Sequence, residues 1–283
     1  MTDKTLGQLV IVATPLGNLG DLSPRALQLL ASADAVFCED TRHSRTLFSA
    51  NNISPSGRLF ALHEHNEAEQ SGEVITRIAR GETVVLISDA GTPGISDPGT
   101  RVVAAVAAAG QVVTTAPGPS AVIAALSVAG IDTERFVMEG FVPRKAGERL
   151  ARYGEWAKEH RTIVFYESPQ RLQATLTELA QHFANRQVCV ARELTKLHEE
   201  LIRGSVAEVA NLVAGREILG EIVVVLAGAG AAPPVEDEVV VACLRDRLNS
   251  GDSTKDAATY AAELYGVSQR VAYELALAIR NTL

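Results

Sequence analysis

The stretch VVLISDAGTPGISDPGT, residues 84–100, joins a short apolar run to a turn rich in glycine and proline. The nearly continuous hydrophobicity of VVLISD (84–89) is typical of a strand buried on both faces of a parallel sheet. Helical patterns separate this run from similar ones, so the sequence predicts an open α/β sheet over residues 1–117. The other runs are LVIVAT (9–14), AVFCED (35–40), LFAL (59–62) and VVTTAP (112–117).

Start signals for helices lie between the predicted strands. Ser23-Pro24 places a capping hydroxyl directly before a proline, which is favoured in the first turn of a helix, and Ser168-Pro169 repeats the pattern. Asn66 and Glu69 have the spacing of a capping box, with asparagine in place of serine or threonine. The sequence therefore predicts helices directly after these signals.

Residues 118–232 carry a second set of apolar runs, which predicts a second α/β domain. Small residues, two prolines and acidic residues in 229–238 indicate a linker after it. The strand candidates are FVMEGF (136–141), TIVFYE (162–167), VCVARE (188–193) and EIVVVLAG (221–228).

The remaining residues, 233–283, are predicted to form a small helical domain. In KDAATYAAELYGVSQRVAYELALAI (255–279), two helical patterns flank Gly266-Val267-Ser268, as in a helix-turn-helix arrangement. The alternative is an ordinary αα-hairpin packed on the body, because the second helix is poor in Lys and Arg.

Composition excludes several classes of protein. The 283 residues are 47% hydrophobic and 21% charged, so the chain is not intrinsically disordered. The widely spaced cysteines Cys38, Cys189 and Cys243 favour neither a disulfide framework nor a cysteine zinc site, and they predict a cytoplasmic location. Without a long apolar stretch or a signal pattern, we expect no contact with membranes. The net charge of −8 argues against a nucleic-acid partner, unless basic residues gather locally.

Three glycine-rich turns directly follow predicted strands. They are Thr14–Asn18, Ser88–Asp97 and Pro117–Ala121. Ligands of open parallel sheets bind outside the carboxyl ends of the strands, and glycine lets the backbone approach a ligand closely. We therefore expect a preformed pocket for a small molecule at this edge.

The turns favour a cationic or zwitterionic ligand. They carry the carboxylates of Asp89 and Asp97 but no Lys or Arg before Arg101, and a polyphosphate would require cations or free backbone N–H groups. The chain has neither GxxxxGK[ST] nor a GxGxxG after its first strand. S-adenosylmethionine, whose sulfonium is positive, fits these turns.

Longer motifs show a resemblance to a known family. TPLGNLGDLSPRA, CEDTRHSRTL, SDAGTPGISDPG, APGPSA, EGFVPR, ESPQRL and RELTKLHEE occur in this order between residues 9 and 228. Together they resemble the tetrapyrrole methylase fold family, and within it the subgroup that methylates ribosomal RNA. SDAGTPGISDPG and RELTK are the most specific of them.

The resemblance implies a fold, a cofactor and a reaction. The fold is two α/β domains with S-adenosylmethionine in the cleft between them, usually in a homodimer. The reaction is methylation of the ribose 2′-hydroxyl of a cytidine in the decoding region of the small-subunit rRNA, as naked rRNA or in the assembled subunit. The implied cofactor-binding residues are Pro15, Leu16, Gly17, Asp89, Ile95, Ser120, Ala121, Phe165 and Tyr166.

Two charged clusters could supply the catalytic groups. A ribose hydroxyl is a weak acid, so a base or a cation that stabilises the alkoxide would help. We expect Glu39 or Glu193 to assist deprotonation and Lys196 or Arg42 to stabilise the developing charge. The alternative is that each cluster is an internal ion pair that fixes a loop.

Local basic groups could bind the RNA backbone. Arg45 lies beside Arg42, and Arg144, Lys145 and Arg149 follow a predicted strand within GFVPRKAGERLAR. We expect these cations to contact phosphates, the alternative for the second group being a solvated helix face. The run His63-Glu64-His65-Asn66-Glu67 lacks a further ligand group, so we interpret it as a polar loop rather than a metal site.

Two other functions remain open at this point. One is a tetrapyrrole C-methyltransferase of the same fold, acting on a small acidic macrocycle. The other is a non-catalytic regulator that binds nucleic acid through its tail and senses a ligand with its α/β body. The basic groups and the RELTK motif favour the RNA methyltransferase.

Overall fold

The computed structural model describes residues 7–230, 237–265 and 267–280. They form two compact units, one from the described residues up to 157 together with 161–227, and one from 158–160 with those after 227. The predicted boundary between residues 232 and 233, and most of the predicted linker 229–238, lie outside the described residues. None of the described helices has the length and apolar character needed to span a bilayer.

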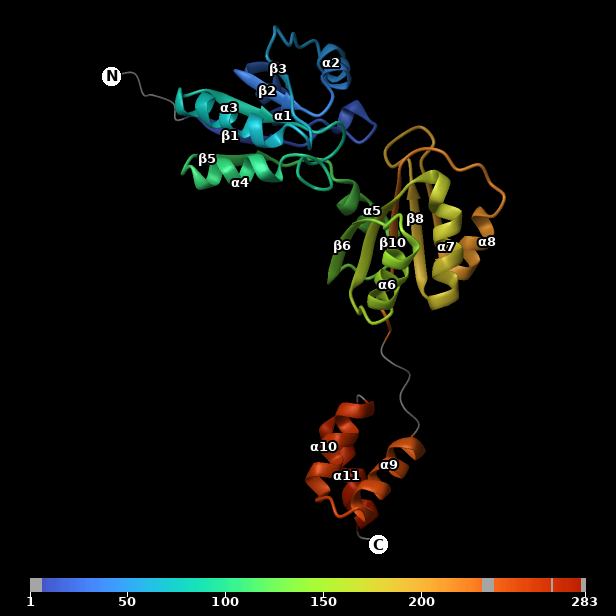
Figure 1. The fold of residues 1–283 in the computed structure, drawn as a ribbon. Helices are drawn as coiled ribbons and strands as arrows, with labels where there is room; N and C mark the ends of the chain where they lie inside the picture. The colour runs from blue at the N-terminus through green and yellow to red at the C-terminus, as the bar shows by residue number, and fades with distance from the viewer. Residues whose placement is uncertain (1–6, 231–236, 266, 281–283) are drawn as a thin grey trace. The chain divides into compact units, whose positions relative to one another are not determined.

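The first half of the larger unit, which we call the first lobe, is a parallel sheet between two layers of helices (Figure 1). Its strand order is β3-β2-β4-β1-β5 and every pairing is parallel. The strands are β1 (Gln8–Val12), β2 (Ala35–Cys38), β3 (Leu59–Ala61), β4 (Thr83–Leu86) and β5 (Val112–Ala116). The five predicted strands of this sheet are confirmed. The near-continuous hydrophobicity of β2 and β4 reflects burial on both faces, whereas the edge strands β3 and β5 are partly exposed.

Four α-helices and a 3-10 turn complete the first lobe. Two helices pack on each face of the sheet: Leu30 and Phe48 against one face, and Val74 and Val106 against the other. The predicted cap at Ser23 is confirmed, because its hydroxyl accepts the Ala26 N–H at 3.1 Å. The helices are η1 (Leu19–Asp21), α1 (Pro24–Ser32), α2 (Thr41–Ala50), α3 (Glu67–Ala79) and α4 (Thr100–Ala108).

The predicted capping box at Asn66 is wrong. Asn66 does precede α3, but its side chain makes no capping hydrogen bond. Its amide instead donates to the Ala61 carbonyl at 3.0 Å and accepts the His63 N–H at 2.9 Å. The Asn66 side chain therefore stabilises the loop before α3 and does not cap the helix.

The second lobe is built on a mixed sheet of order β6-β7-β10-β8-β9. Only β6 and β7 are parallel, and the other pairings are antiparallel. The strands are β6 (Phe136–Phe141), β7 (Thr162–Glu167), β8 (Gln187–Arg192), β9 (Glu200–Ser205) and β10 (Ile222–Leu226). Four of them were predicted, whereas the edge strand β9 was not.

Helices cover both faces of this second sheet. Helix α5 buries Val122 and Leu126 against one face, and the other three pack around Trp156, Leu176 and Val209 on the other. The helices of the lobe are α5 (Ala121–Ala129), α6 (Ala146–Trp156), α7 (Pro169–Phe183) and α8 (Val206–Val213). The predicted α/β class is thereby confirmed.

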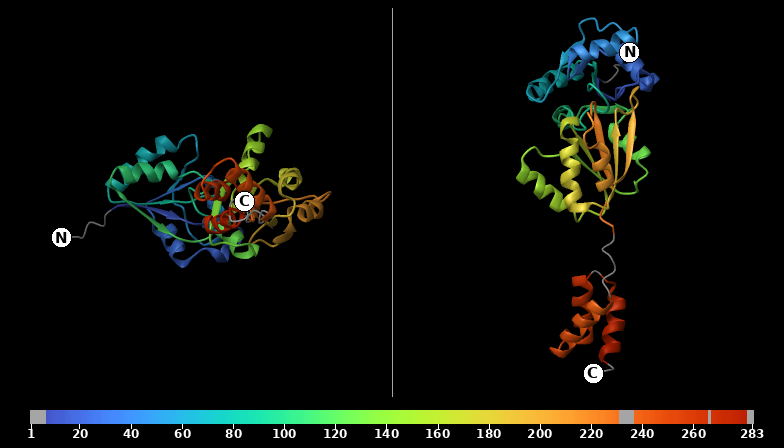
Figure 2. Two further views of the ribbon diagram at one scale, coloured as in Figure 1. Left: turned by 90° about the horizontal axis from the view of Figure 1, so that it is seen from below. Right: turned by 90° about the vertical axis from the view of Figure 1, so that its right-hand side faces the viewer.

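The smaller unit contains three helices that lie side by side in each view (Figure 2). They are α9 (Asp237–Asn249), α10 (Thr254–Tyr265) and α11 (Gln269–Arg280). Buried Val240, Leu244, Ala261, Ala276 and Ile279 form their common core. This unit is therefore a small helical bundle with its own hydrophobic core.

Candidate active site

Hydrogen bonds of backbone and hydroxyl groups join the turns that follow β1, β4 and β5. Thr14 and Gly91 exchange N–H···O bonds of 2.8 and 3.0 Å, and the Thr14 hydroxyl donates to the Ser88 carbonyl at 3.1 Å. The Thr92 hydroxyl donates to the carbonyl of Pro119 at 2.9 Å. The three turns therefore form one continuous wall at the carboxyl edge of the parallel sheet, as their positions after the strands predict.

The turn after β4 has an unusual backbone. Gly91, Gly94 and Gly99 have φ of 82°, 81° and 134°, and Ser96 has φ of 61°. A Cβ at Gly99 would approach the Leu86 side chain to 2.8 Å, so glycine is required there. Positive φ is unfavourable for a residue with a Cβ such as Ser96, and conformations of this kind concentrate at functional sites.

A buried carboxylate holds the far end of this turn. Glu67 is only 4% exposed, and its Oε1 accepts the N–H groups of Gly99, Arg101 and Val102 at 2.9, 2.8 and 3.4 Å. Glu67 therefore satisfies the free N–H groups at the start of α4, which the Gly99 cap cannot do. Part of the polar run 63–67 thus positions the turn rather than exposing a ligand set.

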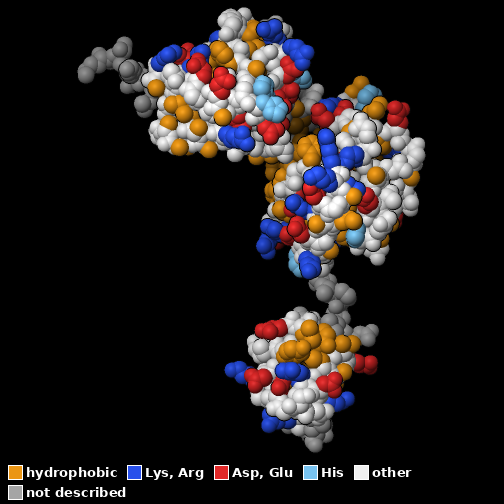
Figure 3. All heavy atoms as spheres, viewed as in Figure 1, with side chains coloured by type: hydrophobic (Ala, Val, Ile, Leu, Met, Phe, Trp, Pro, Cys, Tyr) orange, Lys and Arg blue, Asp and Glu red, His pale blue; other side chains and the backbone are white. Residues whose placement is uncertain are grey.

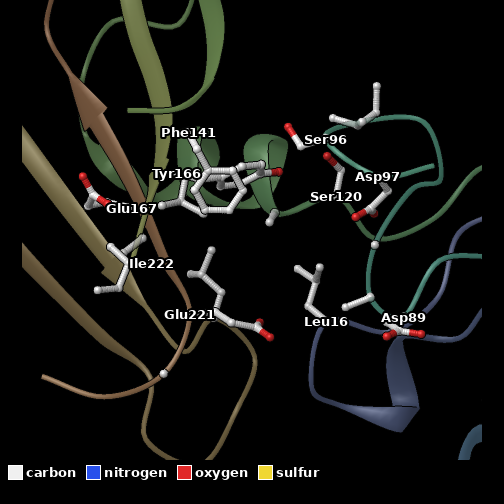
Figure 4. A pocket seen from close by; sticks show the side chains of 18 of the residues that line it. Leu16, Asp89, Ser96, Asp97, Ser120, Phe141, Tyr166, Glu167, Glu221 and Ile222 are labelled. Carbon is white, nitrogen blue, oxygen red and sulfur yellow. The ribbon is translucent and has the colours of Figure 1, made fainter. Parts of the chain in front are cut away.

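A cavity of about 430 Å³ opens between the turns of the first lobe and the sheet of the second lobe. Figure 4 shows the side chains of Leu16, Asp89 and Asp97 facing those of Tyr166 and Glu221 across it. This volume is typical of a site for a small molecule. The apolar part of its lining is Leu16, Ile95, Phe141, Tyr166, Leu194, Ile222 and Val223.

The first-lobe side of the cavity is acidic. Burial and the charges of Glu39 and Asp89 raise the pKa of Asp97 to about 6, although a hydrogen bond with Ser88 opposes the shift. Burial also raises the pKa of Glu39, and the charges of Asp89 and Asp40 add to the effect. The backbone N–H of Asp40 donates to Asp89 Oδ1 at 3.2 Å, which ties the end of β2 to this group. A bound cation would relieve the mutual repulsion of these carboxylates.

The side chains that line the cavity fit S-adenosylmethionine. None of the described residues that line it is Lys or Arg, which disfavours a polyphosphate ligand. Asp89 and Asp97 suit the positive sulfonium and ammonium groups, and the apolar side chains suit the adenine ring. The hydroxyls of Thr92, Ser96 and Ser120 add hydrogen-bonding groups.

A network of charges fixes the loop after β8 at the border of the cavity. Lys196 Nζ lies 2.9 Å from Glu193 Oε1 and 3.1 Å from Glu221 Oε2. The hydrogen bond from Lys196 lowers the pKa of Glu193, and bonds to both carboxylates raise the pKa of Lys196 although burial opposes this. A Cβ on Gly17 would lie 2.1 Å from Lys196 Cγ, so this lysine packs directly on the turn after β1.

Some of the predicted cofactor-binding residues line the cavity, and others do not. Six of them line the cavity: Leu16, Asp89, Ile95, Ser120, Ala121 and Tyr166. Pro15 and Gly17 flank Leu16, and neither belongs to the lining. Phe165 is fully buried in the core of the second lobe, where its ring lies 5.0 Å from that of Trp156, because neighbouring residues of a strand face opposite sides.

None of the four predicted catalytic residues belongs to the lining. Glu39 nevertheless influences the cavity, because its charge raises the pKa of the lining residue Asp97. Arg42 is 88% exposed and pairs with Asp40 at 2.7 Å. Glu193 and Lys196 form the internal ion pair that the alternative interpretation of their cluster describes.

The predicted RNA-binding cations differ in their availability. Arg45, Arg144 and Lys145 are exposed, although Lys145 pairs with Glu148 at 3.0 Å. Arg149 is largely engaged by Glu178, with bonds of 2.6 and 2.8 Å, and it also donates to the Arg144 carbonyl. Figure 3 shows several Lys and Arg side chains, with Asp and Glu among them, on the visible face of the second lobe.

Several lining residues were not predicted. Phe141 ends β6, Leu194 follows β8, and Gly220 and Glu221 precede β10. Phe141 is 61% exposed, and its ring lies 5.3 Å from that of Tyr166. The sequence signal that could have found Phe141 and Leu194 is their place at the ends of predicted strands.

The helical unit lacks the charge of a nucleic-acid-binding surface. Residues 237–283 contain five Lys or Arg and seven Asp or Glu. Its exposed side chains include Tyr260, Leu264, Tyr273 and Leu277, and Figure 3 shows hydrophobic side chains gathered on one face of the unit. Within the described part of the chain, no cluster of His, Cys, Asp and Glu could hold a metal ion.

Comparison with known proteins agrees with this geometry. Residues 8–210 match the family described as Tetrapyrrole (Corrin/Porphyrin) Methylases. Proteins of Mycobacterium tuberculosis and Pseudomonas aeruginosa named Ribosomal RNA small subunit methyltransferase I are each 45% identical to this chain. The alignments cover 97% and 96% of this chain, and 96% and 97% of those proteins.

Solved structures share the fold. A cobalt precorrin-4 methyltransferase matches with a TM-score of 0.60 and 19% identity, over 80% of this chain and 97% of that one. A diphthine synthase matches with a TM-score of 0.58 and 15% identity, over 78% and 89% of the two chains. With the acidic, cation-free cavity between its lobes, the chain therefore belongs to the tetrapyrrole methylase family, whose methyl donor is S-adenosylmethionine.

Proposed function

We propose that this protein methylates the ribose 2′-hydroxyl of a cytidine in the decoding region of small-subunit rRNA. The observation that carries the proposal is the 45% identity, over nearly the whole chain, to proteins named Ribosomal RNA small subunit methyltransferase I. The exposed cations Arg144 and Lys145, which follow the cavity-lining Phe141 by three and four residues, support an RNA substrate.

The cofactor would be held by both lobes. S-adenosylmethionine supplies an electrophilic methyl group next to a positive sulfur. Asp89 and Asp97 balance the positive charges, Leu16 and Tyr166 enclose the apolar parts, and the Ser120 hydroxyl is available for a hydrogen bond. The rigid turns keep these groups in place, which favours a near-attack geometry.

Glu39 is the base that we assign. Burial and the neighbouring Asp89 raise its pKa, and a raised pKa makes a carboxylate a better proton acceptor. S-adenosylmethionine would supply the methyl group to the 2′-oxygen, and Glu39 would accept the proton that the hydroxyl loses. Glu193 is a weaker candidate, because it is already bonded to Lys196 and to the Glu221 N–H.

Lys196 is the cation that we assign to stabilise charge on the 2′-oxygen. It is held in place by Glu221, which lines the cavity, and hydrogen bonds keep it protonated. Arg42 is the alternative, but it is highly exposed and paired with Asp40, which weakens its effect on a reacting oxygen. Glu193 then serves to orient Lys196.

We also propose that the protein is a homodimer. Exposed apolar side chains on α5, Ile123 at 56% and Val128 at 38%, support a self-association surface. Sedimentation equilibrium should give twice the chain mass for the wild type. A wild-type protein that sediments as a monomer at micromolar concentration would refute this part of the proposal.

The reaction is tested with labelled S-adenosylmethionine and small ribosomal subunits from a strain that lacks this gene. The RNA is then hydrolysed with alkali. Because a 2′-O-methyl group removes the hydroxyl that attacks the adjacent phosphate, the label should remain in an alkali-resistant dinucleotide. Label in mononucleotides would indicate base methylation and refute the proposed reaction.

The same experiment distinguishes the two forms of the substrate. An acidic protein with only local basic groups favours an assembled particle, where shape adds to affinity. We expect incorporation into subunits to exceed that into naked rRNA. Equal incorporation into both would show that assembly is not required.

A further inference from the structure

The most exposed large apolar side chain in the described part of the chain is Leu197, at 93%. It lies in the loop 193–199, between β8 and β9. Its neighbour His198 is exposed as well. A leucine so fully in water gains nothing in the isolated protein, so a role in binding is a natural explanation.

The loop is held in one conformation. Glu193 and Thr195 have φ of 53° and 67°, which is unfavourable for residues with a Cβ. The Thr195 N–H donates to Glu199 Oε2 at 2.6 Å, and Glu193 bonds to Lys196 and to the Glu221 N–H. The Thr195 hydroxyl oxygen is buried and has no hydrogen-bond partner. The structure maintains this unfavourable loop, which points to a function of the side chains that it presents.

The loop borders two cavities. Leu194 lines the cofactor cavity, and Leu197 is three residues further, within about 11 Å of chain. Glu193 and His198 line a second cavity of about 300 Å³, which also contains the side chains of Arg192 and Arg216. Both cavities are lined by Gly220. Leu197 is thus presented from a rigid loop that borders the cofactor cavity, and Arg192 and Arg216, both paired with Glu200, line the neighbouring cavity.

We propose that Leu197 is a wedge that packs against an unstacked base next to the methylated nucleotide. The inference rests on the proposed function, because the target ribose must reach the cavity that Leu194 lines. Nucleotides on either side of that ribose then pass along the rim, and an apolar side chain there can hold a neighbouring base out of the stack. Lys196 on this loop is paired with Glu193 and Glu221, so the choice of RNA over an apolar protein surface as the occupant follows from the rRNA substrate of the proposed function.

The proposal is tested with Leu197→Ser in the full-length protein. The matched control is Leu212→Ser, because Leu212 is a 55% exposed leucine on α8 of the same lobe. For methylation of small subunits, we expect kcat/KM of Leu197→Ser to fall by about 10- to 100-fold, through KM, with the Kd for S-adenosylmethionine unchanged. Leu197→Met should restore most of the loss, and the control should stay within about twofold of wild type.

Two results would overturn the wedge. One is a kcat/KM of Leu197→Ser that equals that of the wild type, when the wild type is active in the same assay. The other is a parallel loss of cofactor affinity, because that would make Leu197 a structural residue of the cavity rim.

A second measurement identifies the contact and does not depend on the chemistry. A photoreactive phenylalanine analogue replaces Leu197, or Leu212 as control, and the protein is irradiated with small subunits. We expect a cross-link from position 197 to rRNA and none from position 212. A cross-link to a ribosomal protein, or none to RNA, refutes the wedge. A cross-link from position 197 to rRNA, combined with methylation by the wild type at another kind of atom, refutes only the proposed reaction.

Discussion

At the residue scale, the ionisation of Asp97 links cofactor binding to the stability of the fold. Its pKa is about 6 in the folded protein, against 3.8 in an unfolded chain. Between pH 3.8 and about pH 6, Asp97 is therefore mostly protonated in the folded protein and mostly ionised in the unfolded chain. The contribution of Asp97 to stability therefore falls as pH rises from about 4 to 6, and above pH 6 the ionised group is unfavourable.

Asp97→Asn should therefore stabilise the protein while weakening the binding of S-adenosylmethionine. At pH 7.5 we expect the free energy of unfolding to rise by about 1–3 kcal/mol, and the Kd to rise by about 10-fold or more. At pH 4 the gain in stability should disappear. Urea denaturation at both pH values and calorimetric titration measure the two effects, with exposed Asp21→Asn as control. A destabilised variant at pH 7.5 would contradict the argument.

Glu39 should affect turnover and not cofactor binding. Glu39 is the assigned proton acceptor, so Glu39→Gln should lower kcat by about 100-fold or more. Because Glu39 does not line the cavity, the Kd for S-adenosylmethionine should stay within threefold of the wild-type value. Single-turnover rates and titrations give these values. Exposed Glu64→Gln is the control for a loss of negative charge nearby. Wild-type turnover of Glu39→Gln would transfer the role of base to another residue.

At the element scale, a side chain of one helix caps another. Glu67 on α3 accepts the three N–H groups at the start of α4, so Glu67→Ala leaves buried donors without a partner. We expect a loss of about 2–4 kcal/mol in the free energy of unfolding and weaker cofactor binding, because Asp97 lies just before α4. Exposed Glu69→Ala, on the same helix, should change stability by less than about 0.5 kcal/mol. Equal effects of the two variants would refute the role.

The strands of the sheets differ in how clearly the sequence predicts them. Buried strands such as β4 are continuous apolar runs, so their position and the turns after them could be predicted. The edge strand β9 could not, because it contains Glu200, Arg203 and Gly204 and fully buries only Ile202. The capping role of Glu67 depends on contacts 32 to 35 residues away, which local spacing does not encode.

The lining residues of the cavity also differ in how well the sequence predicts them. Strand-end turns supplied Leu16, Asp89 and Ser120, because topology alone brings the ends of parallel strands together. The wall of the second lobe was harder to predict. Gly220 and Glu221 reach the cavity through a loop whose path depends on hydrogen bonds to Glu193. Phe165 and Tyr166 are adjacent in the motif, and only the alternation of the strand decides which one faces the cavity.

At the scale of the whole molecule, the two units carry different kinds of surface. The larger unit contains the complete cavity and the exposed Arg144 and Lys145. The helical unit has more acidic than basic residues and an apolar face. Phosphate contacts should therefore come from the larger unit, and the salt dependence of binding can separate the contributions of the two.

Deletion of residues 231–283 should leave both the Kd for S-adenosylmethionine and the salt dependence of subunit binding unchanged, because it removes neither the cavity nor the exposed cations. The full-length double variant Arg144→Glu/Lys145→Glu should bind subunits more weakly and lower the slope of log K against log salt by about one per lost phosphate contact, with cofactor affinity intact. Binding isotherms at several salt concentrations measure these slopes, with exposed Arg80→Glu as control. If the deletion flattened the slope and the double variant did not, the phosphate contacts would lie in the helical unit, against its charge.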